Sequence, residues 1–231
     1  MNKGSITILK SGPLSLIQDF GRFGLSHLGL TQGGPVDDYA YSWANHLLQN
    51  PINCPALEIT LGQCAAEVNQ DCVLAITGGD LQAKLDGVPI ANWSTFIARK
   101  GQVLSFGLPT NGLRAYLAVK GGFKAPVSLT STSTVVREKV GGLTQDGQAC
   151  QANQDIQFHT HPIPEHFKPL SVTFRYTPDY NLPLTLRVIE GYQSNLFSKA
   201  AKSTFYNSPF TVSQNSNRMG YRLSGEPVES P

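Results

Sequence analysis

The stretch Leu14–Gly34, LSLIQDFGRFGLSHLGLTQGG, holds the first residues whose types and spacing could do chemistry. It starts as an alternating strand pattern and breaks into closely spaced glycines, with Gln18, Asp19 and Arg22 around the break. Glycines at this density indicate positive φ angles, or places where another segment or a ligand comes close. An acid and a base at this spacing can form a charge-assisted hydrogen bond. The stretch therefore predicts a structural turn fixed by one ion pair, or a loop that a ligand approaches.

A second copy of this pattern lies near the end of the chain, where FTVSQNSNRMGY aligns with LSLIQDFGRFGL without a gap. The alignment pairs Gln18 with Gln214, Arg22 with Arg218 and Gly24 with Gly220. Each copy follows a β-rich run that ends in glycine, ITILKSG in the first case and LRVIEG in the second. We interpret the match as a duplication, which predicts two related β domains.

Three further polar stretches could carry a site. The segment GGPVDD places Asp37 at the start of a predicted helix, where backbone N–H groups can hold an anion. Thr77-Gly78-Gly79-Asp80 joins a strand to a turn, and Ser128–Thr134 is a run of serine and threonine. Each stretch has a structural alternative, in which Asp80, Ser131 and Ser133 satisfy the backbone of their own turns.

Composition and motifs exclude several classes of function. A net charge of +2 without a basic cluster argues against nucleic-acid binding. We find no membrane-spanning apolar run and no signal-peptide segment, so we expect a cytoplasmic protein. The phosphate-loop, dinucleotide and nucleophile-elbow motifs are missing from the sequence. The four cysteines lack CxxC spacing, which favours buried free thiols over disulfides or zinc, and we predict no metal site in spite of HTHPIPEHF.

The hydrophobic pattern predicts a mainly β protein with few helices. A helix is expected over Val36–Leu48, with Pro35 in its first turn, and many short strands follow with a hairpin at Asp86-Gly87. The predicted domains are a first β domain over 1–158, a linker over 159–170 and a partial second β domain over 171–231. In the last part we expect strands at Val172–Tyr176 and Leu184–Glu190, a helix at Asn195–Phe205 and a strand at Phe210–Gln214.

Several long blocks resemble a known family in sequence and in order. They include the whole Leu14–Leu48 region and the segments TGGDLQAKLDGVPI, GLRAYLAVKGGF and SNRMGYRLSG. The chain is similar to the carboxyltransferase-like family known as allophanate hydrolase subunit 2, KipA or the C component of 5-oxoprolinase. The resemblance covers essentially all 231 residues, and it implies a fold of cyclophilin-like β-barrel modules.

The resemblance implies one subunit of a heteromeric, ATP-dependent 5-oxoprolinase, which opens 5-oxoproline to glutamate, or of a related amidohydrolase or carboxyltransferase. The implied partners are a KipI-like protein, which is the B component of 5-oxoprolinase, and a LamB/YcsF-like protein, which is its A component. ATP would be used at the level of the complex, and biotin is possible because related modules in urea carboxylase use it. The alternatives are a non-catalytic regulator that binds a KipI-like inhibitor of a histidine kinase, and a simple binding module for a carboxylated ligand.

Matching motifs carry a set of candidate site residues. The candidate catalytic residues are Asp19, Arg22, Asp80 and Arg218. The candidate substrate-binding residues are Gln18, Asp37, Asn45, Glu58, Thr77, Ser131, Ser133, Asn217 and Arg222. We expect Arg22 and Arg218 to hold a carboxylate or carboxyl-phosphate-like anion, and Thr77, Asp80, Ser131 and Ser133 to bind a cyclic amide or ureido group.

Two departures from the family pattern have consequences. The family usually reads LGSRST where this chain reads LTSTST, so an arginine expected at Thr132 is missing and another substrate is possible. The family also continues beyond SNRMGYRL with further strands, so we expect the chain to be C-terminally truncated and its second domain to be incomplete.

Overall fold

The computed structural model describes residues 3–231 of a chain that divides into two compact units, 1–182 and 183–231. The expected linker, 159–170, lies inside the first unit. Its end is fixed to the first unit's sheet, because Thr95 N donates to Leu170 O at 2.8 Å and Val172 N donates to Trp93 O at 2.9 Å.

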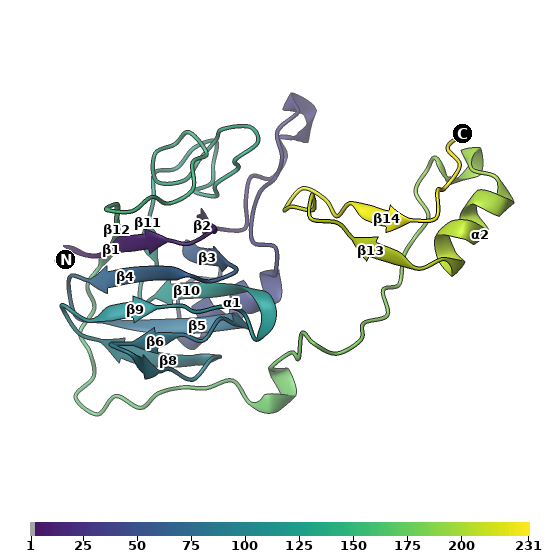
Figure 1. Cartoon of the computed structure of the whole chain (residues 1–231). Helices are drawn as coiled ribbons and strands as arrows, with labels where there is room; N and C mark the ends of the chain where they lie inside the picture. Colours follow the sequence, from purple (N-terminus) through teal and green to yellow (C-terminus); the bar gives the residue numbers. More distant parts are fainter. Residues whose placement is uncertain (1–2) are drawn as a thin grey trace. The chain divides into compact units, whose positions relative to one another are not determined.

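The first unit contains two β-sheets that pack face to face (Figure 1). The seven-stranded sheet has the order β11-β12-β1-β4-β9-β6-β7. Its strands are β1 (Lys3–Ser11), β4 (Cys64–Val68), β6 (Lys84–Leu85), β7 (Val88–Pro89), β9 (Val103–Ser105), β11 (Phe123–Lys124) and β12 (Asp155–His159). The five-stranded sheet has the order β2-β3-β10-β5-β8. Its strands are β2 (Leu14–Gln18), β3 (Ala56–Thr60), β5 (Cys72–Asp80), β8 (Ser94–Ala98) and β10 (Asn111–Val119).

The five-stranded sheet is buried on both faces. One face meets the seven-stranded sheet through an apolar core that includes Ile8, Leu57, Leu74 and Leu117. The other face is covered by helix α1 (Asp38–Leu47), which packs Ala40, Tyr41 and Ala44 against it. Since successive side chains alternate between the two faces of a strand, the α1-facing side can carry polar residues without disturbing the apolar core.

Helix α1 begins two residues later than the sequence pattern suggested. Asp37 is its N-cap, with φ −113° and ψ 90°, and the Asp37 side chain accepts a hydrogen bond from Ala40 N. Pro35 therefore precedes the helix and does not lie in its first turn. A cap side chain satisfies one of the free N–H groups at a helix start, which explains why Asp37 sets the boundary.

Two long excursions leave the sheets on the same side of the first unit (Figure 1). The arm between β2 and α1, residues 19–37, carries the short 3-10 helix η1 (Ser26–Leu28) at its tip. Its base is closed by a hydrogen bond from Arg22 N to Gln32 O at 2.7 Å. The second excursion joins β11 to β12 and includes the serine loop, residues 128–134. Beyond the serine loop, Val135 and Val140 form an isolated β-bridge.

Local turn chemistry was a reliable guide to several elements. The Asp86-Gly87 hairpin is confirmed, since Leu85 pairs with Val88 across it. The strand before this turn is the short β6, Lys84–Leu85. The four cysteines are free, and three of them, Cys64, Cys72 and Cys150, are buried, which confirms the interpretation as thiols.

The second unit contains helix α2 (Lys199–Asn207), the short 3-10 helix η3 (Ser194–Leu196) and the hairpin of β13 (Phe210–Val212) and β14 (Leu223–Gly225). The expected strand at Leu184–Glu190 was wrong. Leu184, Leu186 and Val188 alternate with polar residues, but all three are exposed and the segment pairs with no described strand. The expected strand at Val172–Tyr176 was also wrong, because Phe174–Tyr176 forms the 3-10 helix η2. An alternating pattern makes a strand only where a neighbouring strand supplies a ladder.

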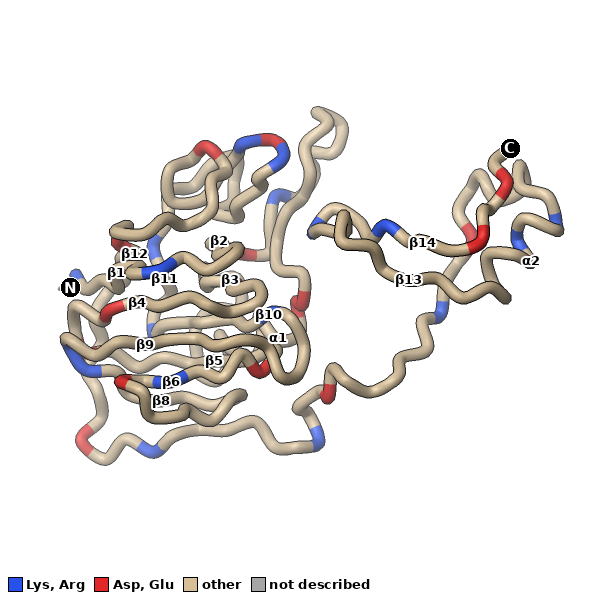
Figure 2. The backbone as a smooth tube through the Cα atoms, in the orientation of Figure 1, with Lys and Arg blue, Asp and Glu red and all other residues tan. Residues whose placement is uncertain are grey.

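Charged side chains are spread along the backbone and form no single basic or acidic run in the described part of the chain (Figure 2). Within residues 3–231, none of the helices is both long enough and apolar enough to cross a membrane.

Candidate functional site

Asp19, which directly follows β2, binds the serine loop with its side-chain carboxylate. Its side chain is 4% exposed. Thr132 N and Thr132 Oγ1 donate to Asp19 Oδ2 at 2.7 and 3.0 Å, and Ser131 Oγ donates to Oδ1. Gly21 N also donates to Oδ1, at 2.9 Å. The carboxylate is thus surrounded by four donors, three of them from the serine loop.

Arg22 binds the same loop through its carbonyl groups. Its Nη2 donates to Ser133 O at 2.6 Å and to Ser131 O at 3.5 Å, and its Nε donates to Ser128 O at 3.1 Å. The side chain is only 2% exposed. Burial lowers the pKa of the Arg22 guanidinium, and the nearby Asp19 charge opposes this shift. Among the described residues, Arg22 Nη1 is buried without a hydrogen-bond partner.

The expected ion pair between Asp19 and Arg22 is not formed in the described part of the chain, where no salt bridge joins them. Instead Asp19 accepts hydrogen bonds from N–H and O–H groups of the serine loop, and Arg22 donates hydrogen bonds to its C=O groups. The physical reason is that seven consecutive residues without regular structure leave backbone donors and acceptors that must be satisfied when buried. Asp19 and Arg22 together supply both kinds of partner and so clamp the loop.

Ser133 links the serine loop to the arm. Its hydroxyl donates to Gln18 Oε1 and accepts from Gly34 N at 2.8 Å, while Gln18 Nε2 donates to Thr134 O at 3.1 Å. Gln18 and Ser133 are both fully buried. Gly33 has φ +74°, and a Cβ there would lie 2.7 Å from Ser133 Oγ. Glycine at this point therefore lets the arm approach the hydroxyl.

Glu58 on β3 lies under the start of α1 and is fully buried. Its Oε2 accepts from Tyr116 Oη at 2.8 Å and from Val36 N at 3.0 Å. Tyr116 Oη in turn accepts from Asp37 N at 2.8 Å. Burial raises the pKa of Tyr116, so the phenol keeps its proton and donates to the carboxylate.

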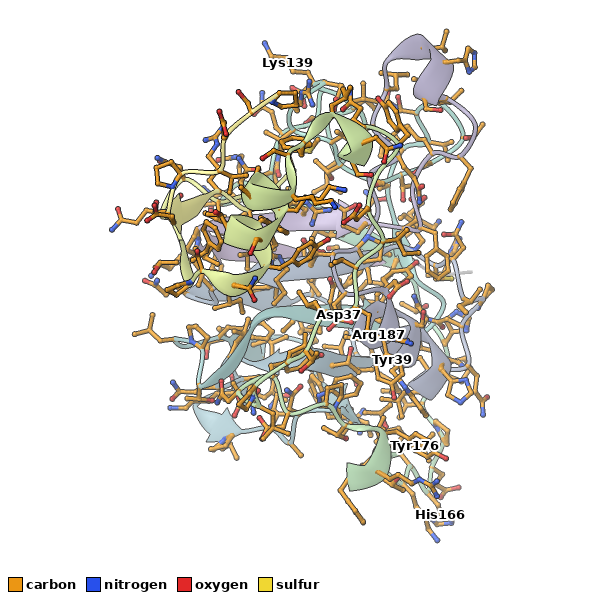
Figure 3. All side chains as sticks on the ribbon, turned by 90° about the vertical axis from the view of Figure 1, so that its right-hand side faces the viewer. Asp37, Tyr39, Lys139, His166, Tyr176 and Arg187 are labelled. Carbon is orange, nitrogen blue, oxygen red and sulfur yellow. The ribbon has the colours of Figure 1, made fainter. Side chains whose placement is uncertain are left out.

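Asp37 extends this network to the surface. Its Oδ1 accepts from Ala40 N, and its Oδ2 accepts from Tyr180 Oη at 2.6 Å. Burial, followed by the Asp37 carboxylate, raises the pKa of Tyr180. Figure 3 shows Asp37 and Tyr39 at the start of α1, and it also labels Tyr176, whose backbone oxygen accepts from Tyr39 Oη at 2.7 Å. The two networks meet in the segment Gly34–Val36, so residues of β2, β3, β10, the arm and the serine loop form one continuous polar site.

Arg114 on β10 was not predicted from the sequence, although it lies next to Glu58. Its Nε is 3.9 Å from Glu58 Oε1, its side chain is 15% exposed, and within the described residues this Nε is buried without a hydrogen-bond partner. The available signal was weak: in GLRAYLAV, Arg114 alternates with buried apolar residues and falls on the same side of the strand as Tyr116. Tyr116 and Tyr180 were missed as well, and nothing in their local sequence marks them.

Three predicted residues lie outside this site and satisfy structural needs. Thr77 is fully buried under α1, where its Oγ1 donates to Ala40 O at 2.6 Å. Asn45 donates to Cys54 O at 2.9 Å and accepts from Asn50. Asp80 is exposed and accepts from Gln82 N at 2.9 Å, as in the Asx turn that was the structural alternative.

The remaining predicted residues belong to the second unit, in the turn between β13 and β14. Asn217 Oδ1 accepts from Met219 N at 2.8 Å, and Arg222 Nη1 donates to Asn215 O at 3.3 Å. Arg218 lies in the same turn. Their roles at a site stay predictions, as do those of the residues in the first unit.

Within residues 3–231, no group of three histidine, cysteine, aspartate or glutamate side chains is arranged to hold a metal ion. The chemistry that the site's side chains offer is hydrogen bonding and charge. Its buried part is occupied by internal partners, and Asp37, Tyr180 and Arg114, at its partly exposed end, can face a ligand.

Comparison with known proteins gives consistent matches over almost the entire chain. Residues 28–231 match the family described as carboxyltransferase domain, subdomain A and B. The chain is 34% identical over 221 residues to the C component of 5-oxoprolinase from Escherichia coli, covering 96% of this chain and 69% of that protein. It is 31% identical over 224 residues to the same component from Haemophilus influenzae, covering 97% of this chain and 70% of that protein.

The fold comparison agrees. The crystal structure of the Kluyveromyces lactis urea carboxylase superposes with a TM-score of 0.84 at 28% sequence identity, covering all of this chain and 21% of that one. This match and the two β-sheets of the first unit confirm the prediction of a mainly β fold. The chain belongs to the carboxyltransferase domain family, subdomains A and B.

Proposed function

We propose that this chain is a subunit of a heteromeric, ATP-dependent enzyme that acts on a small cyclic amide or ureido compound, with 5-oxoproline as the first candidate. The observation that carries the proposal is the 34% identity to the C component of a 5-oxoprolinase over 96% of this chain. A protein called urea amidolyase, from Saccharomyces cerevisiae, is 30% identical over 231 residues. Both names point to substrates in which a carbonyl group is flanked by nitrogen.

The site supports a division of labour among its residues. Asp19 and Arg22 act by holding the serine loop in place, since nearly all their hydrogen-bonding groups already bind it. The part of Arg22 that can still bind an anion is Nη1, which is buried and has no hydrogen-bond partner among the described residues. Arg218, the matching residue of the second copy, remains the other candidate for a carboxylate.

The site around the serine loop does not fit the phosphates of ATP. Binding a triphosphate usually involves a glycine-rich loop with a free lysine or several free guanidinium groups, and the Arg22 guanidinium is instead 2% exposed and bound to loop carbonyls. We therefore propose that another protein of the complex, KipI-like or LamB/YcsF-like, holds ATP.

Biotin is a different case, because its ureido ring offers a carbonyl oxygen and N–H groups. The Arg114 guanidinium, whose side chain is 15% exposed, can donate to such an oxygen, so this end of the site fits the group. When bound, biotin would supply the carboxyl group that a carboxyltransferase moves. The chain's own contribution would be to bind and orient that ring.

The test is to co-express the chain with KipI-like and LamB/YcsF-like proteins and to assay 5-oxoproline-dependent ATP hydrolysis and glutamate release. Arg22→Ala is expected to abolish turnover because it frees the serine loop. Arg99→Ala is the matched control, since Arg99 is exposed and its ion pair within residues 3–231 is with Asp71. A purified complex that assembles but turns over neither 5-oxoproline nor urea would refute the enzyme function and favour a regulator.

A further inference from the structure

The last segment of the first unit, residues 171–182, is a strap that runs outside the two sheets (Figure 1). Its beginning is fixed through the backbone. Val172 N donates to Trp93 O at 2.9 Å, and Ser171 forms an isolated β-bridge with Ser94. Within the described structure, the strap contains the 3-10 helix η2 after Val172 and no strand. From residue 173 onwards it is therefore held in place by contacts that involve side chains.

Tyr176 is the middle attachment of the strap, and it rests on α1. Tyr39 Oη donates to Tyr176 O at 2.7 Å, and the centroids of the Tyr176 and Trp43 rings lie 6.1 Å apart. These contacts bury little apolar surface, because Tyr176 is 50% exposed and the nearby Phe174 is 93% exposed.

A latch of Asp179, Tyr180 and Asn181 holds the far end of the strap. Tyr180 N donates to Asn111 Oδ1 at 2.8 Å, and Asn111 Nδ2 donates to Asp179 Oδ1 at 2.7 Å. Asn181 Nδ2 donates to Thr110 O at 3.1 Å. Thr110 and Asn111 lie at the start of β10, so the latch joins two segments that are far apart in the sequence.

Strand β10 is distorted beside the latch. Asn111 pairs with Asp80, but the next pair in the ladder is Ala115 with Gly78. Residues 112–114 therefore bulge from the ladder opposite Gly79, and bulges of this kind redirect side chains. A Cβ at Gly78 would lie 2.6 Å from Arg114 O, so the backbone facing the bulge has no room for a side chain.

The bulge makes room for the ring of Tyr180. Gly112 has φ +76°, and a Cβ there would lie 2.9 Å from Tyr180 Cδ2. Glycine therefore lets the ring lie against the backbone of β10. From this position Tyr180 Oη donates to Asp37 Oδ2 at 2.6 Å, so the latch also joins the strap to the N-cap of α1.

The attachments of the strap favour opening from its far end. Residues 179–182 are all exposed, and the latch depends on hydrogen bonds that water can replace. Segments with few buried apolar contacts and many exposed hydrogen bonds open locally at low free energy. The attachment at Val172 is different, because Val172 packs against an apolar cluster that includes the buried Trp93. Local opening therefore releases the latch before the hydrogen bond at Val172.

We propose that residues 173–182 are an extendable tether for the second unit, with Tyr180 as its latch. With the latch closed, the connection to the second unit starts after Leu182. With the latch open, the connection starts after Val172, and residues 173–182 add about 33–36 Å of reach at full extension.

The latch also links the length of this tether to the candidate site. When it opens, Asp37 Oδ2 loses its bond from Tyr180, while Asp37 Oδ1 still accepts from Ala40 N. Helix α1 therefore keeps its N-cap in both states, and the Asp37 carboxylate gains a free acceptor only in the open state.

The test starts with hydrogen exchange of the full chain, followed by mass spectrometry. Tyr180→Phe removes the hydroxyl that binds Asp37, and Asp37→Ser keeps a side chain that can cap α1 but lacks the acceptor for Tyr180. Each is expected to speed the exchange of amides 180–182 about tenfold or more, the usual effect of losing a hydrogen bond to a charged group. Tyr192→Phe is the matched control, because Tyr192 is 94% exposed, and it should leave this exchange unchanged.

A distance measurement between two spin labels tests the reach of the tether. The labels are attached at Lys100→Cys and Lys199→Cys in a Cys54→Ser background. Lys100 and Lys199 are exposed, one in each unit, and the other three cysteines are buried. We expect Tyr180→Phe to broaden the distance distribution towards longer distances, by up to about 33–36 Å.

Urea unfolding shows whether each variant is folded, and Asn111→Ala, which removes two bonds of the latch, decides the test if Asp37→Ser does not fold. The proposal is overturned if amides 180–182 of the parent chain exchange as fast as those of an unfolded peptide. It is also overturned if their exchange is unchanged in folded Tyr180→Phe and Asn111→Ala. Faster exchange with an unchanged distance distribution overturns it as well, because the strap would then open without lengthening the tether.

Discussion

The four hydrogen bonds of Asp19 lead to a quantitative prediction for Asp19→Asn. The substitution keeps the size of the side chain and replaces one oxygen by an NH2 group. Oδ1 accepts from Ser131 Oγ and Gly21 N, and Oδ2 accepts from Thr132 N and Thr132 Oγ1. Whichever oxygen is replaced, a backbone N–H then faces another donor, while the hydroxyl groups can rotate to accept.

The magnitude follows from these contacts. One buried N–H without a partner costs about 1–3 kcal/mol, and hydrogen bonds to a charged acceptor are worth about 1.5–3 kcal/mol against about 1 for neutral ones. The remaining two bonds therefore lose about 1–4 kcal/mol in total. We expect Asp19→Asn to lower the free energy of unfolding by about 2–7 kcal/mol, a large part of the total for a typical protein.

The assay is urea unfolding followed by fluorescence, together with hydrogen exchange of the amides at 128–134. The matched control is Asp80→Asn, because Asp80 is exposed and its carboxylate accepts from Gln82 N in a turn where asparagine serves equally well. We expect this control to change stability by less than about 0.5 kcal/mol. A loss below about 1 kcal/mol for Asp19→Asn, with unchanged protection of the loop amides, would contradict a clamp formed by Asp19.

Three further predictions test other parts of the first unit. Ser133→Ala leaves Gly34 N and Gln18 Oε1 without the Ser133 hydroxyl, and it should lower the free energy of unfolding by about 2 kcal/mol or more. The control Ser128→Ala should leave the free energy of unfolding nearly unchanged. Equal effects of the two substitutions in urea unfolding would refute the role of the Ser133 hydroxyl. Gly78→Ala should cost about 1–3 kcal/mol more than Gly87→Ala, because both glycines have positive φ but a Cβ at Gly87 would meet nothing within 4 Å; equal losses would argue against the crowded bulge. Burial raises the pKa of Cys72 and of Cys150 to about 12 from a reference of 9.0. The thiols of the unfolded chain therefore ionise first, and the free energy of unfolding should fall between pH 9 and 12. The urea midpoint should fall less steeply across this range in the double variant Cys72→Ala/Cys150→Ala, and an identical slope would contradict the raised pKa of these two thiols.

Local chemistry in the sequence was sufficient for the elements that depend on few neighbours. The Asp86-Gly87 turn and the apolar pattern of α1 act within a few residues, so their signals are readable one segment at a time. Leu184–Glu190 has an equally regular alternation, but the ladder that a strand needs depends on a distant segment. The same limit explains the error in its assignment.

The candidate site was predictable in its residue types and not in its pairings. Gln18, Asp19, Arg22, Ser131 and Ser133 do come together, yet the expected contact between Asp19 and Arg22 was wrong because both bind the serine loop. Arg114 escaped notice because its significance depends on a bulge, and the bulge is visible only when Gly78 and Gly79 are seen opposite it.

The clamp on the serine loop has a consequence for the order in which the protein is assembled. Asp19 and Ser131 are separated by 112 positions, and Arg22 and Ser133 by 111. At synthesis rates of about 5–20 residues per second, Asp19 leaves the ribosome roughly 6–22 s before Ser131. Contacts of such long range also form late in refolding, because the entropy of loop closure opposes them first. We expect the two sheets to form before this cluster, so its closure is the last step in the folding of the first unit.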